Sequence, residues 1–376
     1  MGQTCGVTKE SKLISQQEND MDVNSDFKIS IHDTISKVTD KDTIHSGKVT
    51  EVNSMVTSRA SGVGDTGSGE IDKSDGLWVM YDVVSKKPSF TLLDHPTIVS
   101  SFLCPCDVHS ICPNALGQAW TCDMFSNDIT LIDNIGYVLQ QITCRWLVDD
   151  ISLADDRYQS PFLLCSKKKT VMDLRCPKSI FKTRHRPTSL CYSGQNHVVV
   201  GTKQTVTMYT NQGDVVGASV REDSGIIWPW RMSVCRLVGN IAVIDTDLKK
   251  YGGLGKPNIL VMDNSLKPLF RYRGRGSVSG MTSSFEPSDL AYDSYGNLVV
   301  ADYNSRSLEL ISGEGKHLKT LHTDAGRIQA VGIQIGGKLP RDGEQEPHSG
   351  NILWVSIYYP DDEDEMDQIK LFRYYS

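Results

Sequence analysis

Short β-rich runs separated by polar turns recur through most of this 376-residue sequence. The runs combine Val, Ile, Thr and Tyr, which favour pleated, half-buried strands. No convincing amphipathic helix accompanies them. Parallel α/β folds need crossover helices, so the pattern disfavours those folds. Clear examples are HVVVGT (197–202), TVTMYT (205–210), NIAVIDT (240–246), NILVMD (258–263), NLVVAD (297–302) and NILWVSIYY (351–359).

The polar turns repeat at a nearly regular spacing. Taken at Gly136, Leu174, Gly213, Ser265 and Gly315, successive turns lie 38, 39, 52 and 50 residues apart. A four-stranded propeller blade uses about 40–50 residues. A sixth unit covers residues 328–374, and residues 77–102 could supply a strand that closes the ring and removes its exposed sheet edges. We therefore expect an all-β fold, a six-bladed β-propeller over residues 77–376.

Residues 1–76 differ in composition and are expected to form a disordered tail and linker. They contain no Trp or Tyr and a single Phe, Phe27, and the stretch 58–76 is rich in Gly, Ser and Asp. Such a segment cannot bury enough apolar surface to offset its ordering entropy. The alternating run 27–32 is open to an alternative interpretation as a short strand, for which the sequence shows no partner.

Charge and targeting signals narrow the class of protein. The net charge is −7; residues 1–75 hold 8 Lys and Arg against 13 Asp and Glu, so the other 301 residues carry only −2. A nearly neutral body neither demands nor excludes binding to nucleic acid.

No window approaches the ~20 apolar residues of a membrane helix, and no apolar signal segment is visible. We expect a cytoplasmic protein with reduced thiols and no membrane span. Gly2 and Cys5 are candidate lipidation sites, although Gly6 stands where the myristoylation pattern has Ser or Thr.

Residues 285–321 carry the most specific pattern. They read FEPSDLAYDSYGNLVVADYNSRSLELISGEGKHLKTL, in which Gly296 permits a tight turn while Leu298 and Val300 alternate into the core. Residues 120–142 are a weaker copy. The segment resembles the NHL repeat at Phe285, Pro287, Ala291, Asp293, Gly296, 299–302, Asn304, Arg306, Gly315 and Leu318.

The chain from residue 77 onward resembles the C-terminal propeller of tripartite-motif NHL proteins. In that family a RING finger, B-box zinc fingers and a coiled coil precede the propeller, and the RING gives ubiquitin-ligase activity. This sequence shows no Cys/His ladder before Cys104 and no heptad run. The resemblance therefore implies a binding scaffold within ubiquitin-ligase-related pathways, without ligase activity of its own.

Motifs for catalysis or metal binding are weak. Cys104, Cys106, His109 and Cys112 follow C-x-C-x2-H-x2-C, which is not a common structural zinc spacing, and in a strand His109 and Cys112 would point to opposite faces. Neither a Gly-rich phosphate loop nor a G-x-S-x-G elbow occurs. We expect no catalytic residue, metal or cofactor, and hence no enzyme. The alternative is a metal-dependent hydrolase or lyase of six-bladed propeller type, whose inward carboxylates or histidines the sequence does not assemble.

Basic and aromatic residues gather in loops of one class. In a propeller blade with strands a to d, the b–c and d–a loops emerge on the same face. Single-stranded nucleic acid binds basic surfaces interleaved with rings. The alternative is ordinary loop solvation, with the two tryptophans packed between blades. The acidic run 361–367 belongs to the same loop class in blade six. We predict a face that binds single-stranded RNA, protein partners or both, through Lys167, Lys168, Lys169, Arg184, His185, Arg186, Trp228, Trp230, Arg231, Lys249, Lys250, Tyr251 and Arg306.

Overall fold

The structure is a computed structural model that describes residues 30–32, 91–123, 125–153, 161–174, 176–194, 196–219, 221–275, 285–335, 351–360 and 367–376. Of the predicted tail, only β1 (Ser30–His32) falls within these ranges, and it pairs antiparallel with β6. This strand lies inside the run 27–32, for which a short strand was the alternative interpretation of the sequence. Gly2, Cys5 and the acidic residues 361–366 lie outside the described residues. No helix in the described ranges is long and apolar enough to span a membrane.

The first three sheets of the fold each contain four consecutive antiparallel strands. Blade one is β3 (Ser110–Pro113), β4 (Gln118–Cys122), β5 (Asp128–Asp133) and β6 (Val138–Thr143), with β1 at its outer edge. Blade two is β7 (Asp150–Leu153), β8 (Pro161–Cys165), β9 (Thr170–Asp173) and β10 (Cys176–Lys182). Blade three is β11 (Pro187–Tyr192), β12 (His197–Thr202), β13 (Thr205–Thr210) and β14 (Val215–Ala218).

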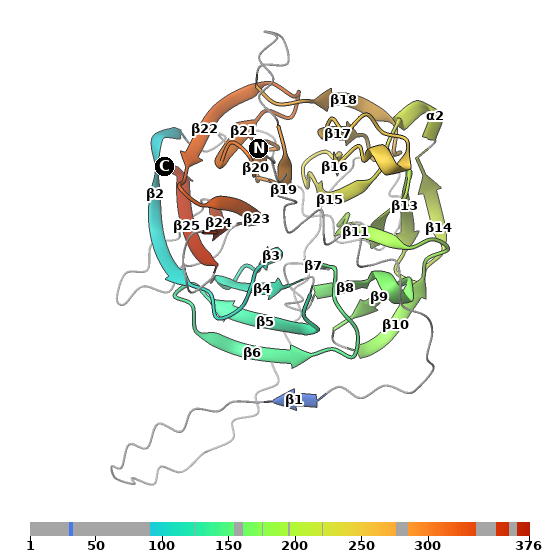
Figure 1. Cartoon of the computed structure of the whole chain (residues 1–376), viewed down its shortest axis with the longest axis horizontal. Coiled ribbons are helices and arrows are strands. Elements are labelled where there is room, and N and C mark those ends of the chain that lie inside the picture. Colours follow the sequence, from blue (N-terminus) through green and yellow to red (C-terminus); the bar gives the residue numbers. More distant parts are fainter. Residues whose placement is uncertain are drawn as a thin grey trace, which may run out of the picture. The chain divides into compact units, whose positions relative to one another are not determined.

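The remaining three sheets complete the ring (Figure 1). Blade four is β15 (Pro229–Val234), β16 (Ile241–Asp245), β17 (Asn258–Met262) and β18 (Pro268–Tyr272). Blade five is β19 (Pro287–Tyr292), β20 (Leu298–Asp302), β21 (Ser307–Ile311) and β22 (His317–Thr323). Blade six is β23 (Arg327–Gln334), β24 (Ile352–Tyr358), β25 (Gln368–Tyr375) and β2 (Leu92–Leu103). The predicted six-bladed all-β propeller is confirmed.

Chain closure takes place in blade six. The outer strand β2 comes from the N-terminal side of the propeller and pairs antiparallel with β25. Backbone hydrogen bonds extend the join on both sides, from Cys104 N to Asp367 O at 2.7 Å and from Ser376 N to Thr91 O at 3.0 Å. The predicted closing strand within residues 77–102 is therefore present, and it removes the open edge that the ring would otherwise expose.

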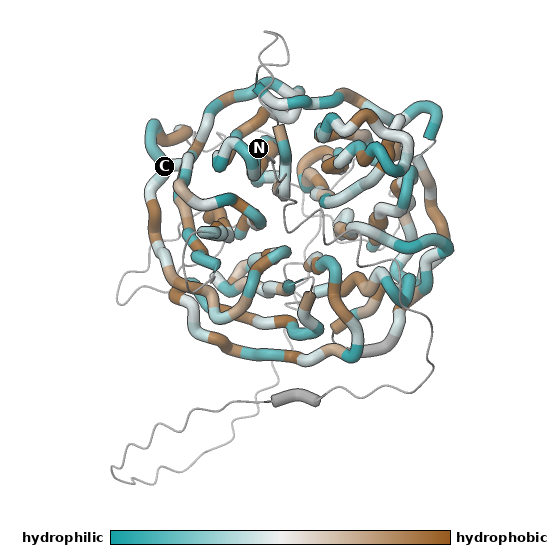
Figure 2. Tube along the Cα trace, in the orientation of Figure 1, coloured by the Kyte–Doolittle hydropathy of each residue, from teal (hydrophilic) through white to brown (hydrophobic). Residues whose placement is uncertain are grey.

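The hydrophobic core lies between neighbouring sheets. One buried cluster joins Ala242 and Ile244 of blade four to Tyr292 and Val300 of blade five. Similar clusters lie between blades one and two, two and three, three and four, and six and one. The b strands β12, β16 and β20 are buried almost throughout, so their sequences read as continuous apolar runs. Apolar segments accordingly recur in all six sheets (Figure 2).

The turns that gave the sequence its period are built by side-chain capping. All five sampled turns connect strands c and d, and in four of them the first residue of the turn caps it with a side-chain oxygen. In two of these four turns the capping residue is Asp. Asp133 Oδ1 accepts hydrogen bonds from the backbone N–H groups of Ile135 and Tyr137, and Asp263 Oδ1 accepts them from Ser265 and Lys267, at 2.8–3.0 Å. Such Asx turns hold a tight reversal without long-range contacts, which is why they could be read from the local sequence.

Three short helices occupy connections on one face of the ring. The 3-10 helices η1 (Ser166–Lys168) and η2 (Lys249–Tyr251) lie in the b–c loops of blades two and four, and α2 (Arg221–Ser224) lies in the d–a connection from blade three to blade four. All three therefore belong to the face on which the binding residues were predicted.

Candidate binding face and central channel

The predicted basic residues occupy the expected loop class. Lys167, Lys168 and Lys169 lie between β8 and β9, and Arg184, His185 and Arg186 lie between β10 and β11. Lys249, Lys250 and Tyr251 form η2, and Trp228 directly precedes β15. Because all of these are b–c or d–a connections of adjacent blades, they share one face. The exposed residues of α2, Arg221, Glu222 and Asp223, lie on the same face and make it less uniformly basic than predicted.

A stacked aromatic pair lies where blades three and four meet on this face. The rings of Trp228 and Tyr251 have centroids 4.5 Å apart and planes inclined by 11°. Two ammonium groups lie over the Tyr251 ring, those of Lys203 at 4.5 Å and Lys250 at 4.7 Å from its centroid. Lys203 comes from the turn between β12 and β13, so three loops contribute to the cluster. We call Lys203, Trp228, Lys250 and Tyr251 the blade-four platform.

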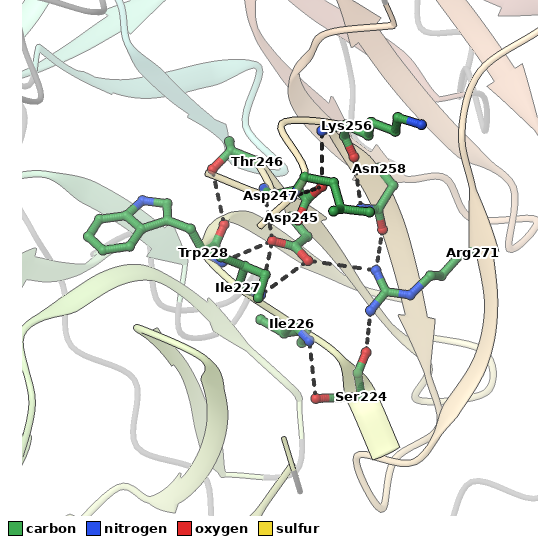
Figure 3. Close-up of polar contacts among 11 residues, drawn as sticks. Ser224, Ile226, Ile227, Trp228, Asp245, Thr246, Asp247, Lys256, Asn258 and Arg271 are labelled. Atoms are coloured by element: carbon green, nitrogen blue, oxygen red, sulfur yellow. Dashed lines mark hydrogen bonds and ion pairs between the residues drawn. The ribbon is translucent and has the colours of Figure 1, made fainter. Parts of the chain in front are cut away.

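Asp245 holds the Trp228 side of the platform (Figure 3). This buried carboxylate, at the end of β16, accepts hydrogen bonds from the backbone N–H of Ile227 at 3.2 Å and of Trp228 at 2.9 Å. The backbone N–H of Thr246 donates to Trp228 O at 3.1 Å. Arg271 adds an ion pair to Asp245 at 3.6 Å and a hydrogen bond to Ser224 O. The tryptophan backbone is thus fixed on both sides.

Asp247 and Gln204 hold the Tyr251 side. Asp247 Oδ2 accepts hydrogen bonds from the backbone N–H of Leu254 and Lys256, both at 3.0 Å, which close the loop that follows η2 (Figure 3). Gln204 Nε2 donates to Tyr251 O and Gln204 N donates to Ile227 O, both at 3.1 Å. One residue of blade three therefore ties both halves of the platform together, through its side chain and its backbone, so the platform is preorganised.

A second basic–aromatic cluster lies over blades one and two. Lys168 Nζ is 3.9 Å from the Trp146 ring centroid, and the Arg145 guanidinium is 4.8 Å from it. Both Arg145 and Trp146 belong to the d–a connection between β6 and β7. Sequence reasoning missed this pair and Lys203. The signal was available, because Arg145-Trp146 is a basic–aromatic dipeptide in a loop of the correct class.

Two predicted residues take other positions, and a third lies on the predicted face in another blade. Trp230 and Arg231 lie inside β15 rather than in a loop, and Arg231 is only 4% exposed, so it lines the central channel instead of the outer face. The Trp230 ring meets His109 edge-on at 5.5 Å and packs against the core between blades four and five. Arg306 lies between β20 and β21, in the b–c loop of blade five, so it belongs to the predicted face; its guanidinium donates to Ala325 O at 2.5 Å. The two basic–aromatic clusters of the face are carried by loops of blades one to four.

The central channel contains a set of charged residues that the sequence did not reveal. Strand pairing places six residues of the a strands at equivalent positions: Ser110, Asp150, Ser189, Arg231, Asp289 and Ala330. Arg231 crosses the channel to Asp150 at 3.1 Å and donates to His109 O at 2.9 Å. It bounds a cavity of about 150 Å³ lined by the six a strands.

The two channel carboxylates join neighbouring blades. Asp150 Oδ2 accepts the Leu190 N–H of blade three, and Asp289 Oδ2 accepts the Val331 N–H of blade six, both at 2.9 Å. Burial raises the pKa of Asp289 to about 7 and also raises the pKa of Asp150, while the charge of Arg231 opposes both shifts. Burial holds the pKa of His109 well below its usual value, so that ring is neutral. These groups act first as clamps between blades.

No family model matches this chain, and no curated protein matches it. The function must therefore be argued from the site itself, since a propeller fold alone is compatible with many functions.

The four residues of the C-x-C-x2-H-x2-C motif make different contacts and do not converge on one point. Cys104 and Cys106 touch through their sulfur atoms at 3.6 Å. His109 faces Trp230 across the channel, and Cys112 Sγ accepts the Leu153 N–H at 3.2 Å. Within the described ranges, no group of three or more His, Cys, Asp or Glu residues is placed to hold a metal ion.

Proposed function

We propose that this propeller is a non-catalytic binding scaffold, and that the b–c/d–a face of blades two to four binds single-stranded RNA. The observation that carries the proposal is the blade-four platform, in which lysine ammonium groups border a preorganised pair of rings. Single-stranded nucleic acid needs both elements, because its phosphates pair with cations and its bases stack on rings. The resemblance of residues 285–321 to the NHL repeat supports a scaffold role.

The two clusters together suggest a path for the strand. The Lys168–Trp146 cluster and the blade-four platform are carried by loops of blades two and four, and the blade-three connection with Arg184 and His185 lies between them in the ring. A linear polyanion that follows this arc would meet cations at each step and rings at both ends. Lys168, Lys203 and Lys250 would leave their rings for phosphates as bases take their places, since a cation–π contact at an exposed site contributes only about 0.5–1 kcal/mol.

A protein partner is the second candidate function. Leu254, in the same loop as Tyr251, leaves 72% of its surface exposed. An exposed leucine beside a rigid aromatic pair is the kind of apolar anchor that protein interfaces use. Binding of this kind would depend on Leu254 and would change little with salt, whereas RNA binding falls steeply as salt rises.

The hydrolase or lyase alternative has less support. The channel does bring Asp150 and Asp289 inward, which the sequence did not predict, but both carboxylates accept hydrogen bonds from backbone N–H groups of the next blade.

A cytoplasmic location agrees with the cysteines, since the eight whose side chains are described are all free thiols.

The test is the salt dependence of RNA binding by matched variants. The double variant Lys203→Ala/Lys250→Ala removes two platform cations, and Lys267→Ala/Lys316→Ala removes two exposed lysines from c–d turns on the opposite face. We expect the first pair to reduce the slope of log affinity against log salt by about 1.4 and the second to leave it unchanged. Replacing Lys167, Lys168 and Lys169 with Ala should reduce the slope by about 2. Tyr251→Ala should weaken binding by about 1–3 kcal/mol through lost stacking.

Two outcomes would overturn the RNA proposal. One is a parent protein that does not bind single-stranded RNA at low salt. The other is equal affinity and slope for both double variants. Loss of a protein partner on Leu254→Ser, with no salt dependence, would instead support the second candidate.

A further inference from the structure

Two cysteine thiols touch where the closing strand enters blade one. Cys104 directly follows β2, and Cys106 lies two residues further on, before β3 begins. Their Sγ atoms are 3.6 Å apart, which is van der Waals contact for two unbonded sulfurs. A disulfide requires about 2.05 Å between sulfurs, so a small movement of the two side chains would bring them to bonding distance.

The backbone around the pair is fixed by blade six. Cys104 N donates to Asp367 O at 2.7 Å, and Val108 N donates to Asp367 Oδ2 at 2.6 Å. The same carboxylate accepts Ser356 Oγ at 3.3 Å. Both hydrogen bonds go to Asp367, which is itself only 2% exposed. They fix the backbone at the two ends of residues 104–108, the segment that carries both thiols.

The two thiols differ in exposure and in protonation. Cys104 is fully buried, whereas Cys106 is half-buried and also contacts Thr121 Oγ1 at 3.6 Å. The hydrogen bond from Cys104 lowers the pKa of the Cys106 thiol to about 7, with further help from Thr121. The same hydrogen bond, together with burial, raises the pKa of Cys104. Of the two thiols, Cys106 therefore ionises more readily, and Cys104 keeps its proton.

We propose that Cys104 and Cys106 form a dithiol site that reacts with hydrogen peroxide or small hydroperoxides and closes to a disulfide. Cys106 Sγ attacks one peroxide oxygen, the O–O bond breaks, and the departing hydroxide takes up a proton and leaves as water. Cys104 Sγ then attacks the sulfenic sulfur, the S–O bond breaks, and the hydroxyl leaves with the Cys104 proton as a second water. The two thiols together lose two electrons and two protons, and one peroxide is reduced to two waters.

The other described cysteines lack this combination. Burial raises the pKa of Cys122, Cys144, Cys165 and Cys191, so their thiols stay protonated. Cys112 is half-buried like Cys106, but its sulfur accepts the Leu153 N–H, and Cys235 is buried. Redox-active cysteines are accessible thiolates next to a resolving thiol, and Cys106 alone among these matches that description.

The experiment titrates the full chain with hydrogen peroxide at pH 7 in the presence of a metal chelator. Thiols are then alkylated in denaturant, and peptides are mapped by mass spectrometry. We expect the peptide that holds both cysteines to escape alkylation first and to be lighter by two hydrogen atoms. A dithiol reductant should restore alkylation at both positions.

Single variants identify the roles of the two thiols. Cys104→Ser should leave a sulfenic acid on Cys106 that dimedone traps, because no resolving thiol is present. Cys106→Ser should slow the loss of the first thiol at least tenfold. About half of a thiol with a pKa of about 7 is ionised at pH 7, against roughly a hundredth of a cysteine thiol at its ordinary pKa of 9.0. Cys112→Ser is the matched control and should behave as the parent.

Two results would overturn the proposal. One is a parent protein in which Cys112 or a buried cysteine is oxidised before Cys106. The other is oxidation of Cys106 that stops at the sulfenic acid while Cys104 stays free. Both are read from the parent chain, so neither depends on the folding of a variant, and neither outcome involves RNA binding.

Discussion

Arg231 of blade four reaches across the central channel and pairs with Asp150 of blade two at 3.1 Å, with both side chains 4% exposed. The same guanidinium donates to the carbonyl oxygens of His109 and Asp149, so one side chain links three blades. A charge buried in this way persists only when it is paired and hydrogen-bonded. The pair therefore links blades across the ring and also lines its central cavity.

Arg231→Met should destabilise the propeller strongly. Removing one partner leaves Asp150 as an uncompensated buried carboxylate, a change that costs about 3–5 kcal/mol. The double variant Arg231→Met/Asp150→Asn should recover part of that loss, because the buried charge is removed as well. Denaturant unfolding of the parent, both single variants and the double variant forms the cycle that measures the coupling. Additive single effects would show that the pair is not coupled.

Stability should fall as pH rises between about 4 and 7. Burial raises the pKa of Asp289 from 3.8 to about 7 and does the same for Asp367, so the folded chain binds protons that the unfolded chain releases. The stability gained from this proton uptake is fully present below the pKa of the unfolded state and is lost as the pH rises through the pKa of the folded state. For Asp289 this corresponds to a loss on the order of 4 kcal/mol across that window.

The two carboxyl groups can be separated by neutral variants. Asp289→Asn should reduce the slope of unfolding free energy against pH, Asp367→Asn should reduce it by a similar amount, and the double variant should reduce it further. Denaturant melts at several pH values between 4 and 8 measure the slope. An unchanged slope in Asp289→Asn would place the origin of the pH dependence elsewhere.

Gly296 should tolerate a side chain poorly because of its backbone. Its φ is +80°, and a Cβ at this position would meet Cys235 Sγ and Leu237 Cδ1 at an ordinary 3.5 Å, so the strain lies in the dihedral angle rather than in a clash. Gly296→Val should cost on the order of 1–3 kcal/mol in a denaturant melt. Gly217→Ala is the control, since its backbone is outside the left-handed region and its Cβ would meet nothing within 4 Å. Equal effects of the two variants would contradict this explanation.

The parts of the fold that the sequence predicted are those that local chemistry determines. Turn caps such as Asp263 and left-handed glycines such as Gly296 act within a few residues, so the number of blades and the closing strand could be inferred from their spacing. Loop classes followed from the strand count alone, which is why Lys168 and Lys250 lie on the expected face.

The channel could not be predicted because it depends on strand register across blades. A register shift lies between Pro229 and Arg231, and equivalent shifts follow Pro187 and Pro287 in blades three and five, so the side chain that faces the channel depends on pairing with the next strand. Asp150 and Asp289 likewise look like ordinary turn acids beside their strands, although each lies inside an a strand and accepts an N–H from the next blade. Contacts of this kind appear only when six separate units are assembled.

Closure by β2 makes the two ends of the propeller interdependent. In the described sheet β2 pairs with β25, and Lys319 of the neighbouring blade donates to Leu93 O at 2.8 Å. Deleting residues 368–376 removes β25, separates β2 from β24 and reopens the ring, so we expect a large loss of stability and of a single cooperative transition. Among the described contacts, deleting residues 1–75 removes the short pairing of β1 with β6, and we expect the thermal midpoint to stay nearly unchanged. Differential scanning calorimetry of both truncations gives the comparison. A C-terminal truncation as stable as the parent would mean that the ring does not depend on its closing strand.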